Sequence, residues 1–110
     1  MLAILTTIAD VGIIDNMSAT LIMKFKNVNQ DGSIIEMVVW KVSKSVAPSE
    51  HMYKYRLVFI KDGVRVIGFD NERGKGDHYH LLDQEFSYSF INLDTLIDDF
   101  IALVKERGKP

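Results

Sequence analysis

The sequence predicts an α+β domain in which an antiparallel β meander is covered on one face by a C-terminal helix. For most of the chain, short β-branched and aromatic runs alternate with tight turns, and this spacing favours strands that pair antiparallel with their sequence neighbours. The last part of the chain changes to an apolar period of three to four residues, which is typical of an amphipathic helix. About five to six strands are expected before that helix.

Six segments have the composition and alternation of strands, and short polar turns join most of them. The turns at 30–33 and 62–63 each contain Asp-Gly, which supplies the backbone angles of a tight hairpin. The longest connection, 43–51, contains Pro48 and has no period, so a loop is expected there. The expected strands are 19–28, 33–42, 52–61, 64–70, 78–82 and 85–91.

The helix is predicted between Leu93 and Val104, where apolar residues recur at intervals of three or four. Asn92 is a residue type that caps helix N-termini, and Asp94 suits the positive end of the helix dipole. Gly108 follows the last turn and suits the exit of the chain. A helix over one face of the meander would bury the apolar surfaces of both.

Composition limits the chain to one domain and removes several kinds of chemistry. With 110 residues it can bury a single core, and its hydrophobic fraction of 47% and charged fraction of 25% are ordinary for a globular protein. Because there is no cysteine, disulfides, thiolate catalysis and zinc–thiolate sites are excluded. A cytoplasmic location is expected.

Residues 1–18 are expected to form an N-terminal extension ahead of a single domain at 19–108. They are apolar, but Asp10 interrupts them and no Lys or Arg precedes it, so they fit neither a signal peptide nor a membrane span. They could form an extra helix or strand, or they could be an extension upstream of a start at Met17 or Met23. No membrane association is expected.

The stretch 69–80, FDNERGKGDHYH, concentrates groups that move protons or bind anions and metals. His78 and His80 are two positions apart, so on a strand both side chains leave the same face, with roughly 6–7 Å between their Cα atoms. Two imidazoles at that spacing can share one metal ion or one phosphate group. The alternative is a polar strand face that carries two incidental histidines.

A glycine-rich turn beside the histidines could hold a phosphate group. Gly74 and Gly76 would let backbone N–H groups approach an anion, with Lys75 projecting between them. A nucleotide-hydrolysing P-loop is rejected, because Gly76 stands where Ser or Thr is required and no helix follows.

A metal site is a second interpretation of the same stretch. His78 and His80, with a carboxylate from Asp70 or Asp77, would make a two-histidine, one-carboxylate site for zinc, manganese or iron. The sequence does not decide between this site and chemistry without a metal. The expected cofactor is therefore a divalent metal ion or none.

Acid–base catalysis without a metal is the third interpretation. One of the two histidines would act as the acid and the other as the base, because an imidazole titrates near neutral pH. Asp77 or Asp70 would orient an imidazole. Cations on the turn and the sheet would stabilise negative charge on the phosphate of an RNA substrate. These cations are Lys75, Arg73, Arg56 and Arg65.

Three segments, taken in order, resemble the TumE-like family of small toxins from prokaryotic toxin–antitoxin pairs. They are DGSIIEMVVWKV (31–42), HMYKYRLVFIKDGVRVIGFDNERGKGDHYH (51–80) and FINLDTLIDDFIALV (90–104). The resemblance implies a growth-inhibiting toxin that is neutralised by direct binding of a helix-turn-helix antitoxin. An endoribonuclease is the expected activity, because many small toxins of this kind act on RNA.

Two other functions stay open from the sequence. The protein could be a non-catalytic binding module that acts through its sheet or an exposed edge strand, since edge strands readily accept a strand from another chain. A homodimer of this chain also stays open. The other alternative is a metal-dependent transferase of nucleotidyl or phosphoryl groups.

Overall fold

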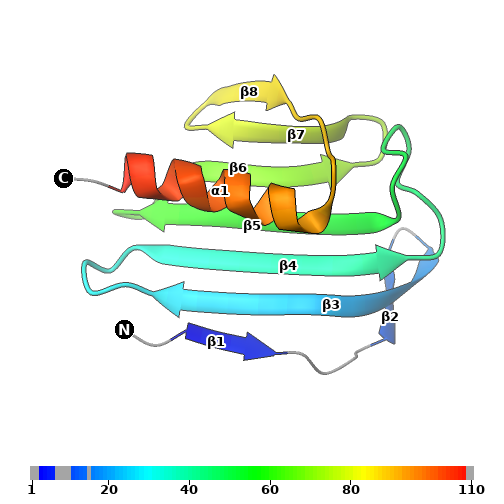
Figure 1. The fold of residues 1–110 in the computed structure, drawn as a ribbon, viewed down its shortest axis with the longest axis horizontal. Helices are drawn as coiled ribbons and strands as arrows, with labels where there is room; N and C mark the ends of the chain where they lie inside the picture. Colours follow the sequence, from blue (N-terminus) through cyan, green and yellow to red (C-terminus); the bar gives the residue numbers. More distant parts are fainter. Residues whose placement is uncertain (1–2, 7–10, 15, 109–110) are drawn as a thin grey trace.

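The computed structural model describes residues 3–6, 11–14 and 16–108, and it places them in one eight-stranded antiparallel sheet with a helix across one face (Figure 1). The predicted α+β class is confirmed. The elements are β1 (Ala3–Thr6), β2 (Val11–Ile14), β3 (Met17–Val28), β4 (Ile34–Val42), β5 (Tyr53–Lys61), β6 (Val64–Glu72), β7 (Gly76–Leu81), β8 (Gln84–Ser87) and α1 (Leu93–Arg107).

From β3 to β8 the sheet is a meander, because each strand pairs antiparallel with its neighbour in the sequence. All six predicted strands are present, with small differences at most of their ends. The exception is β8, which was predicted to reach residue 91 and ends at Ser87. Tyr88 still donates its N–H to the carbonyl of Asp77, but its hydroxyl donates to Asp99 on α1, and the chain turns there toward the helix.

Two further strands come from the predicted N-terminal extension. β1 pairs with 24–27 of β3, and β2 pairs with 17–20 of the same strand. Of the two structures expected for this extension, the strand is therefore correct for 3–6 and 11–14. Residues 1–2, 7–10 and 15 lie outside the described part of the chain.

The Asp-Gly turns form as predicted. Asp62 and Gly63 have φ angles of 53° and 74°, the pair of positive angles that closes a two-residue hairpin between twisted strands. In the earlier turn, Gly32 has a φ of 86°, and the carboxylate of Asp31 accepts the N–H of Ser33. Both hairpins are therefore encoded by a few adjacent residues.

The main core lies between the sheet and α1. Phe59 and Phe69, from β5 and β6, are buried together with Leu96 and Phe100 from the helix. The rings of Phe69 and Phe100 meet edge to face with centroids 5.9 Å apart. These contacts confirm that the apolar stripe of the helix covers one face of the meander.

The ends of α1 follow the predicted signals. The side-chain oxygen of Asn92 accepts the N–H of Thr95 at 2.8 Å, and Gly108 donates its N–H to the carbonyl of Val104. Among the described residues, no helix is long and apolar enough to cross a membrane.

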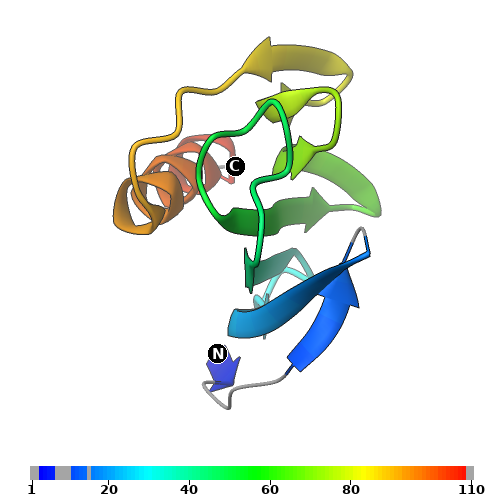
Figure 2. The same ribbon diagram turned by 90° about the vertical axis from the view of Figure 1, so that its right-hand side faces the viewer.

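On the other face of the sheet, here called the open face, the described part of the chain forms no helix. Figure 2 shows the sheet nearly end-on, with α1 on one side and β2 turned toward the other. There, Met17, Ala19 and Val42 form a second small core, against which Ile14 and Trp40 pack. The open face is therefore partly covered at the β3–β4 side, and no described element covers it toward β6, β7 and β8.

Candidate metal centre

The strand register gathers charged side chains on the open face. Directly paired residues of neighbouring strands project to the same side of a sheet. One row of such pairs runs from Arg56 through Asp70 to His78. Asp70 and His78 are thus adjacent because of the β6–β7 register.

The two histidines of the HxH pair lie on the same face, as their spacing predicts. Their ring centroids are 5.0 Å apart. One ligand atom from each of Asp70, His78 and His80 can be chosen so that all three lie within 4.8 Å of one another. These residues are the group predicted from the sequence as metal ligands, with Asp70 as the carboxylate.

His78 is almost fully buried, and its two ring nitrogens have different surroundings. Nδ1 lies 3.0 Å from the carbonyl oxygen of Gly76, which can only accept, so Nδ1 carries the proton in this contact. Nε2 lies 2.5 Å from Oδ1 of Asp70. Yet neither of these two atoms has a partner with hydrogen-bond geometry among the described residues.

With Nδ1 protonated, Nε2 faces the carboxylate oxygen either as a lone pair or as an N–H. Two acceptors at that separation repel each other unless a positive charge joins them. An Nε2 proton would supply the charge, but its direction does not satisfy a hydrogen bond to Oδ1. A cation bound by both atoms satisfies them, and the bond from Nδ1 to a backbone carbonyl is the arrangement that orients metal-ligating histidines.

His80 completes the cluster from the next row. Burial lowers the pKa of its imidazole, and Arg65 and His78 add to this effect against the opposing influence of Glu85 and Asp70. This lower pKa favours the neutral form of the His80 imidazole. A neutral imidazole is the form that binds a metal ion.

Glu85, on β8, is a member of this neighbourhood that the sequence analysis missed. Its Oε1 lies 3.5 Å from Nε2 of His80 and 2.7 Å from Nζ of Lys75. Glu85 could have been identified as the direct cross-strand partner of His80, but only once the β7–β8 register was known.

Lys75 projects from the β6–β7 turn toward this cluster, where Glu85 binds it. The hydrogen bond with Glu85 raises the pKa of the Lys75 ammonium, which therefore stays protonated. The same contact lowers the pKa of the Glu85 carboxyl. Lys75 can neutralise an anion at the rim, but it cannot act as a base.

Asp77 does not belong to this site. It is adjacent to His78 in β7, so its side chain lies on the helix face. There its Oδ2 lies 2.7 Å from His51 Nε2 and accepts the hydroxyl of Tyr55, while Oδ1 accepts the hydroxyl of Ser49. The predictions that Asp77 orients His78 or His80, or binds a metal with them, are therefore wrong.

The glycine turn does not form the predicted phosphate cradle. Gly74 donates its N–H to the carbonyl of Ala47, and the N–H of Lys75 goes to the carbonyl of Glu72. Gly76 is buried, and a Cβ added to it would lie 3.1 Å from Cγ of Pro48. These glycines let the turn pack on the 43–52 loop, so the Gly74 amide is unavailable to an anion.

The predicted phosphate-binding arginines lie in three different places. Arg56 is exposed beside Asp70, with Nη1 3.9 Å from Oε2 of Glu36. Arg65 runs along Gly68, whose absent Cβ would lie 3.2 Å from the Arg65 Cδ. Arg73 is exposed in the turn between β6 and β7. Arg56 and Arg65 therefore flank the histidines on the open face.

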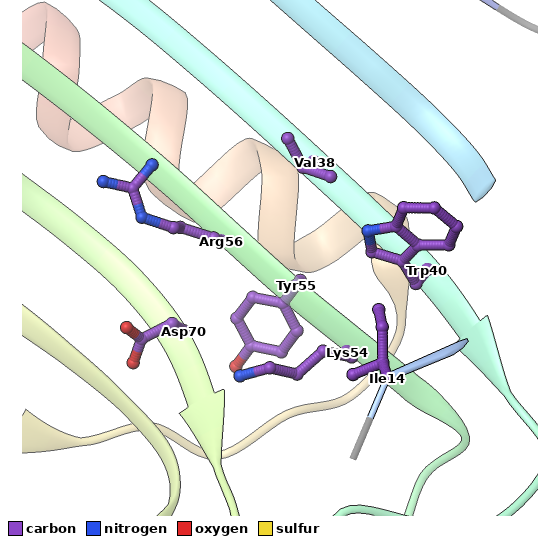
Figure 3. A pocket seen from close by; sticks show the side chains of 7 residues that line it. All are labelled: Ile14, Val38, Trp40, Lys54, Tyr55, Arg56 and Asp70. Atoms are coloured by element: carbon purple, nitrogen blue, oxygen red, sulfur yellow. The ribbon is translucent and has the colours of Figure 1, made fainter. Parts of the chain in front are cut away.

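A pocket of ≈ 270 Å³ borders the cluster and shares Asp70 with it (Figure 3). Trp40 and Ile14 lie at one end, and Arg56 and Asp70 lie toward the other. The complete lining is Ile14, Val38, Trp40, Lys54, Tyr55, Arg56 and Asp70.

The model of the family described as Toxin TumE matches residues 8–108 of this chain. No curated protein matches the chain. No solved structure matches it either.

Proposed function

Because the chain belongs to the toxin TumE family, and is thus the toxin of a toxin–antitoxin system, we propose that it acts on RNA as a metal-dependent endoribonuclease. Asp70, His78 and His80 would hold the divalent cation. The observation that carries this proposal is the buried pair of His78 Nε2 and Asp70 Oδ1, which lie 2.5 Å apart without hydrogen-bond geometry.

The ligand set fits a first-row divalent ion such as zinc or manganese. With bonds of about 2.0–2.2 Å, two ligand atoms on one ion stand at most about 4.4 Å apart. The three atoms here lie within 4.8 Å of one another, so the most distant pair must close by a few tenths of an ångström. The 2.5 Å between His78 Nε2 and Asp70 Oδ1 must open toward the roughly 3.3–3.6 Å that separates two ligands at the tetrahedral angle. Asp70 and His80, whose side chains are 22% and 17% exposed, can make these shifts more readily than His78, which is 4% exposed.

Burial argues against the metal-free interpretation. A general acid or base must come within hydrogen-bond reach of the proton that it transfers. His78 is enclosed, with Nδ1 bonded to Gly76 and Nε2 facing Asp70, so it has no open path to an RNA hydroxyl. As a metal ligand, His78 would use both nitrogens in their present positions: Nδ1 would keep its bond to Gly76, and Nε2 would bind the ion.

The chain's own residues can perform the remaining tasks. A bound divalent ion would act as a Lewis acid on the phosphodiester and lower the pKa of an attacking hydroxyl or water. Arg56 and Arg65 flank the cluster and would neutralise the phosphate during the reaction. Lys75 is held at the rim by Glu85 and adds a further protonated cation there.

The test is RNA cleavage by the purified protein, with and without a chelator. Cleavage should stop with chelator, return with Mn²⁺ or Zn²⁺, and fall at least about 100-fold in His78→Ala and Asp70→Asn, since loss of a metal ligand removes the Lewis acid. Asp98→Asn, an exposed acid on α1, is the matched control and should cleave at the wild-type rate.

Cleavage that survives both the chelator and Asp70→Asn would contradict the proposal. Intact RNA that instead gains nucleotides would identify a nucleotidyl transferase. Growth arrest that persists in folded His78→Ala would support the binding-module alternative.

The family implies an antitoxin partner. We propose that this partner carries a helix-turn-helix domain and neutralises the toxin by direct binding, and that both act in the cytoplasm, where RNA is present. A homodimer formed through the exposed edge strand β8 stays a prediction, which the oligomeric state in solution would test.

A further inference from the structure

The pocket next to the metal cluster combines two kinds of wall. Ile14, Val38 and Trp40 form an apolar wall, while Lys54 and Arg56 add positive charge near Asp70. Binding sites for small molecules commonly join apolar surface to a few convergent polar groups. At ≈ 270 Å³ this pocket is below the usual range for drug-sized ligands and suits a single ring system.

Strand β2 packs against Trp40 and fixes the position of its indole ring. A Cβ at Gly12 would lie 3.7 Å from Cη2 and Cζ3 of the indole, so the β2 backbone packs directly against the ring. Ile14 packs against the same small core as Trp40. A ring that is fixed before binding loses little entropy when a planar ligand stacks on it.

The cations lie where a phosphate attached to such a ligand would be. Lys54 is the direct cross-strand partner of Trp40, and Arg56 is that of Asp70. Lys54 donates to the carbonyl of Asn71, and this contact fixes the ammonium on the β6 side of the strand. Among the described residues, the Arg56 guanidinium makes a long ion-pair contact of 3.9 Å to Glu36, and this geometry leaves donors for a phosphate oxygen.

The pocket is continuous with the metal cluster. Asp70 lines the pocket and also faces His78 Nε2. Neighbouring strands are about 4.8 Å apart, so β4, which carries Trp40, lies on the order of 10 Å from β6, which carries Asp70. A nucleotide whose base reaches Trp40 can therefore place a phosphate beside Arg56 and the cluster.

We propose that this pocket is the nucleobase subsite of the enzyme and that its substrate is single-stranded RNA. One unpaired base stacks on Trp40, and Arg56 and Lys54 bind the adjoining phosphate. Paired bases are excluded because a base inside a duplex cannot present its face to a side chain. The inference rests on the proposed function and adds the substrate class.

The chain contains a single tryptophan, so tryptophan fluorescence, excited where the tyrosines do not absorb, reports on this pocket alone. The experiment titrates the full-length protein, in chelator to prevent cleavage, with each of the four nucleoside 5′-monophosphates. At least one nucleotide should quench the fluorescence saturably. Ribose 5-phosphate and inorganic phosphate, which lack a base, should not.

Two variants separate specific binding from general attraction of anions. Arg56→Ala should weaken nucleotide binding about tenfold, because it removes a charged phosphate donor while Trp40 remains. Lys26→Ala is the matched control, since Lys26 also ion-pairs with Glu36 at 3.6 Å but does not line the pocket. It should leave nucleotide affinity unchanged.

A third pair of variants tests stacking without fluorescence. Binding of a dye-labelled 2′-deoxy oligonucleotide, measured by anisotropy, should be retained in Trp40→Phe and weakened about tenfold in Trp40→Leu. The pocket proposal is overturned if no nucleotide quenches, if ribose 5-phosphate quenches equally, or if Arg56→Ala and Lys26→Ala behave alike.

The two proposals fail in different ways. Metal-dependent RNA cleavage without nucleotide quenching would leave the proposed function intact and refute the subsite. Nucleotide quenching by a protein that cleaves no RNA would support the subsite and refute the endoribonuclease.

Discussion

Asp77 shows why a catalytic residue type in a promising stretch can serve the fold instead. Its carboxylate accepts the hydroxyls of Ser49 and Tyr55 and contacts His51, three residues from a loop and a strand. The order of hydrogen bonds differs from that of a catalytic triad, because the Ser49 hydroxyl donates to Asp77 and not to His51. The other nitrogen of His51 accepts the N–H of Tyr53, so no nucleophile is paired with a base.

The surroundings of Asp77 keep it ionised. Burial raises the pKa of its carboxyl, but hydrogen bonds from His51, Ser49 and Tyr55 outweigh it and bring the pKa below the ordinary value of 3.8. Burial and the contact with Asp77 raise the pKa of the Tyr55 phenol, which thus remains a donor. The network ties the loop at 43–52 to β7.

Asp77→Asn should destabilise the protein by about 1–3 kcal/mol at pH 7, because it weakens charge-assisted hydrogen bonds in a buried network. A carboxyl whose folded pKa is depressed contributes stability above its unfolded pKa and loses it as the pH falls through the folded value. The difference between wild type and variant should therefore shrink below about pH 4. Denaturant unfolding from pH 7 to pH 2.5 measures this, and a difference that stays constant over that range would contradict the assignment.

At the scale of elements, the β6–β7 hairpin was predicted correctly in one respect and wrongly in another. The same-face placement of His78 and His80 follows from strand geometry and needed no tertiary information. Asp77 was grouped with them by closeness in sequence, although its odd spacing from both places it on the other face. The glycine turn was misjudged because its partner, Ala47, lies in a loop far away in the chain.

Two glycine substitutions in this hairpin form a matched pair. Gly74 and Gly76 have φ angles of 87° and 79°, so alanine at either position incurs backbone strain of about 1–2 kcal/mol. At Gly74 nothing lies within 4 Å of the added Cβ, whereas at Gly76 it meets Pro48. Gly76→Ala should therefore lower the unfolding free energy more than Gly74→Ala, as chemical denaturation measures. Equal losses would show that the turn does not pack on Pro48.

At the scale of the whole molecule, the two faces of the sheet differ: one carries the main core, and the other carries the candidate metal ligands. The helix face holds the main core, and its elements were predictable because caps, turns and apolar periods are local signals. The open face holds the histidines, the acidic groups and the pocket. The pocket was not predictable, because it depends on β2 folding against Trp40 and on the registers that bring Lys54, Arg56 and Asp70 together.

A metal ion bound between three strand residues should stabilise the whole sheet. Ligand at 100 times its dissociation constant adds about 2.7 kcal/mol to the free energy of unfolding when it binds only the folded state. Mn²⁺ or Zn²⁺ should therefore raise the melting temperature of the metal-stripped wild type and leave that of Asp70→Asn almost unchanged. Thermal scans with Asp98→Asn as the control, which should respond like wild type, measure this difference.

Calorimetric titration of the metal-stripped protein with Mn²⁺ and Zn²⁺ tests the centre most directly, because it requires no knowledge of the substrate. Wild type should bind one ion per chain, and His78→Ala should lose that binding while its far-ultraviolet circular dichroism stays that of the folded sheet. Wild type that takes up neither ion, or a His78→Ala variant that binds as well as wild type, would contradict a metal centre formed by Asp70, His78 and His80.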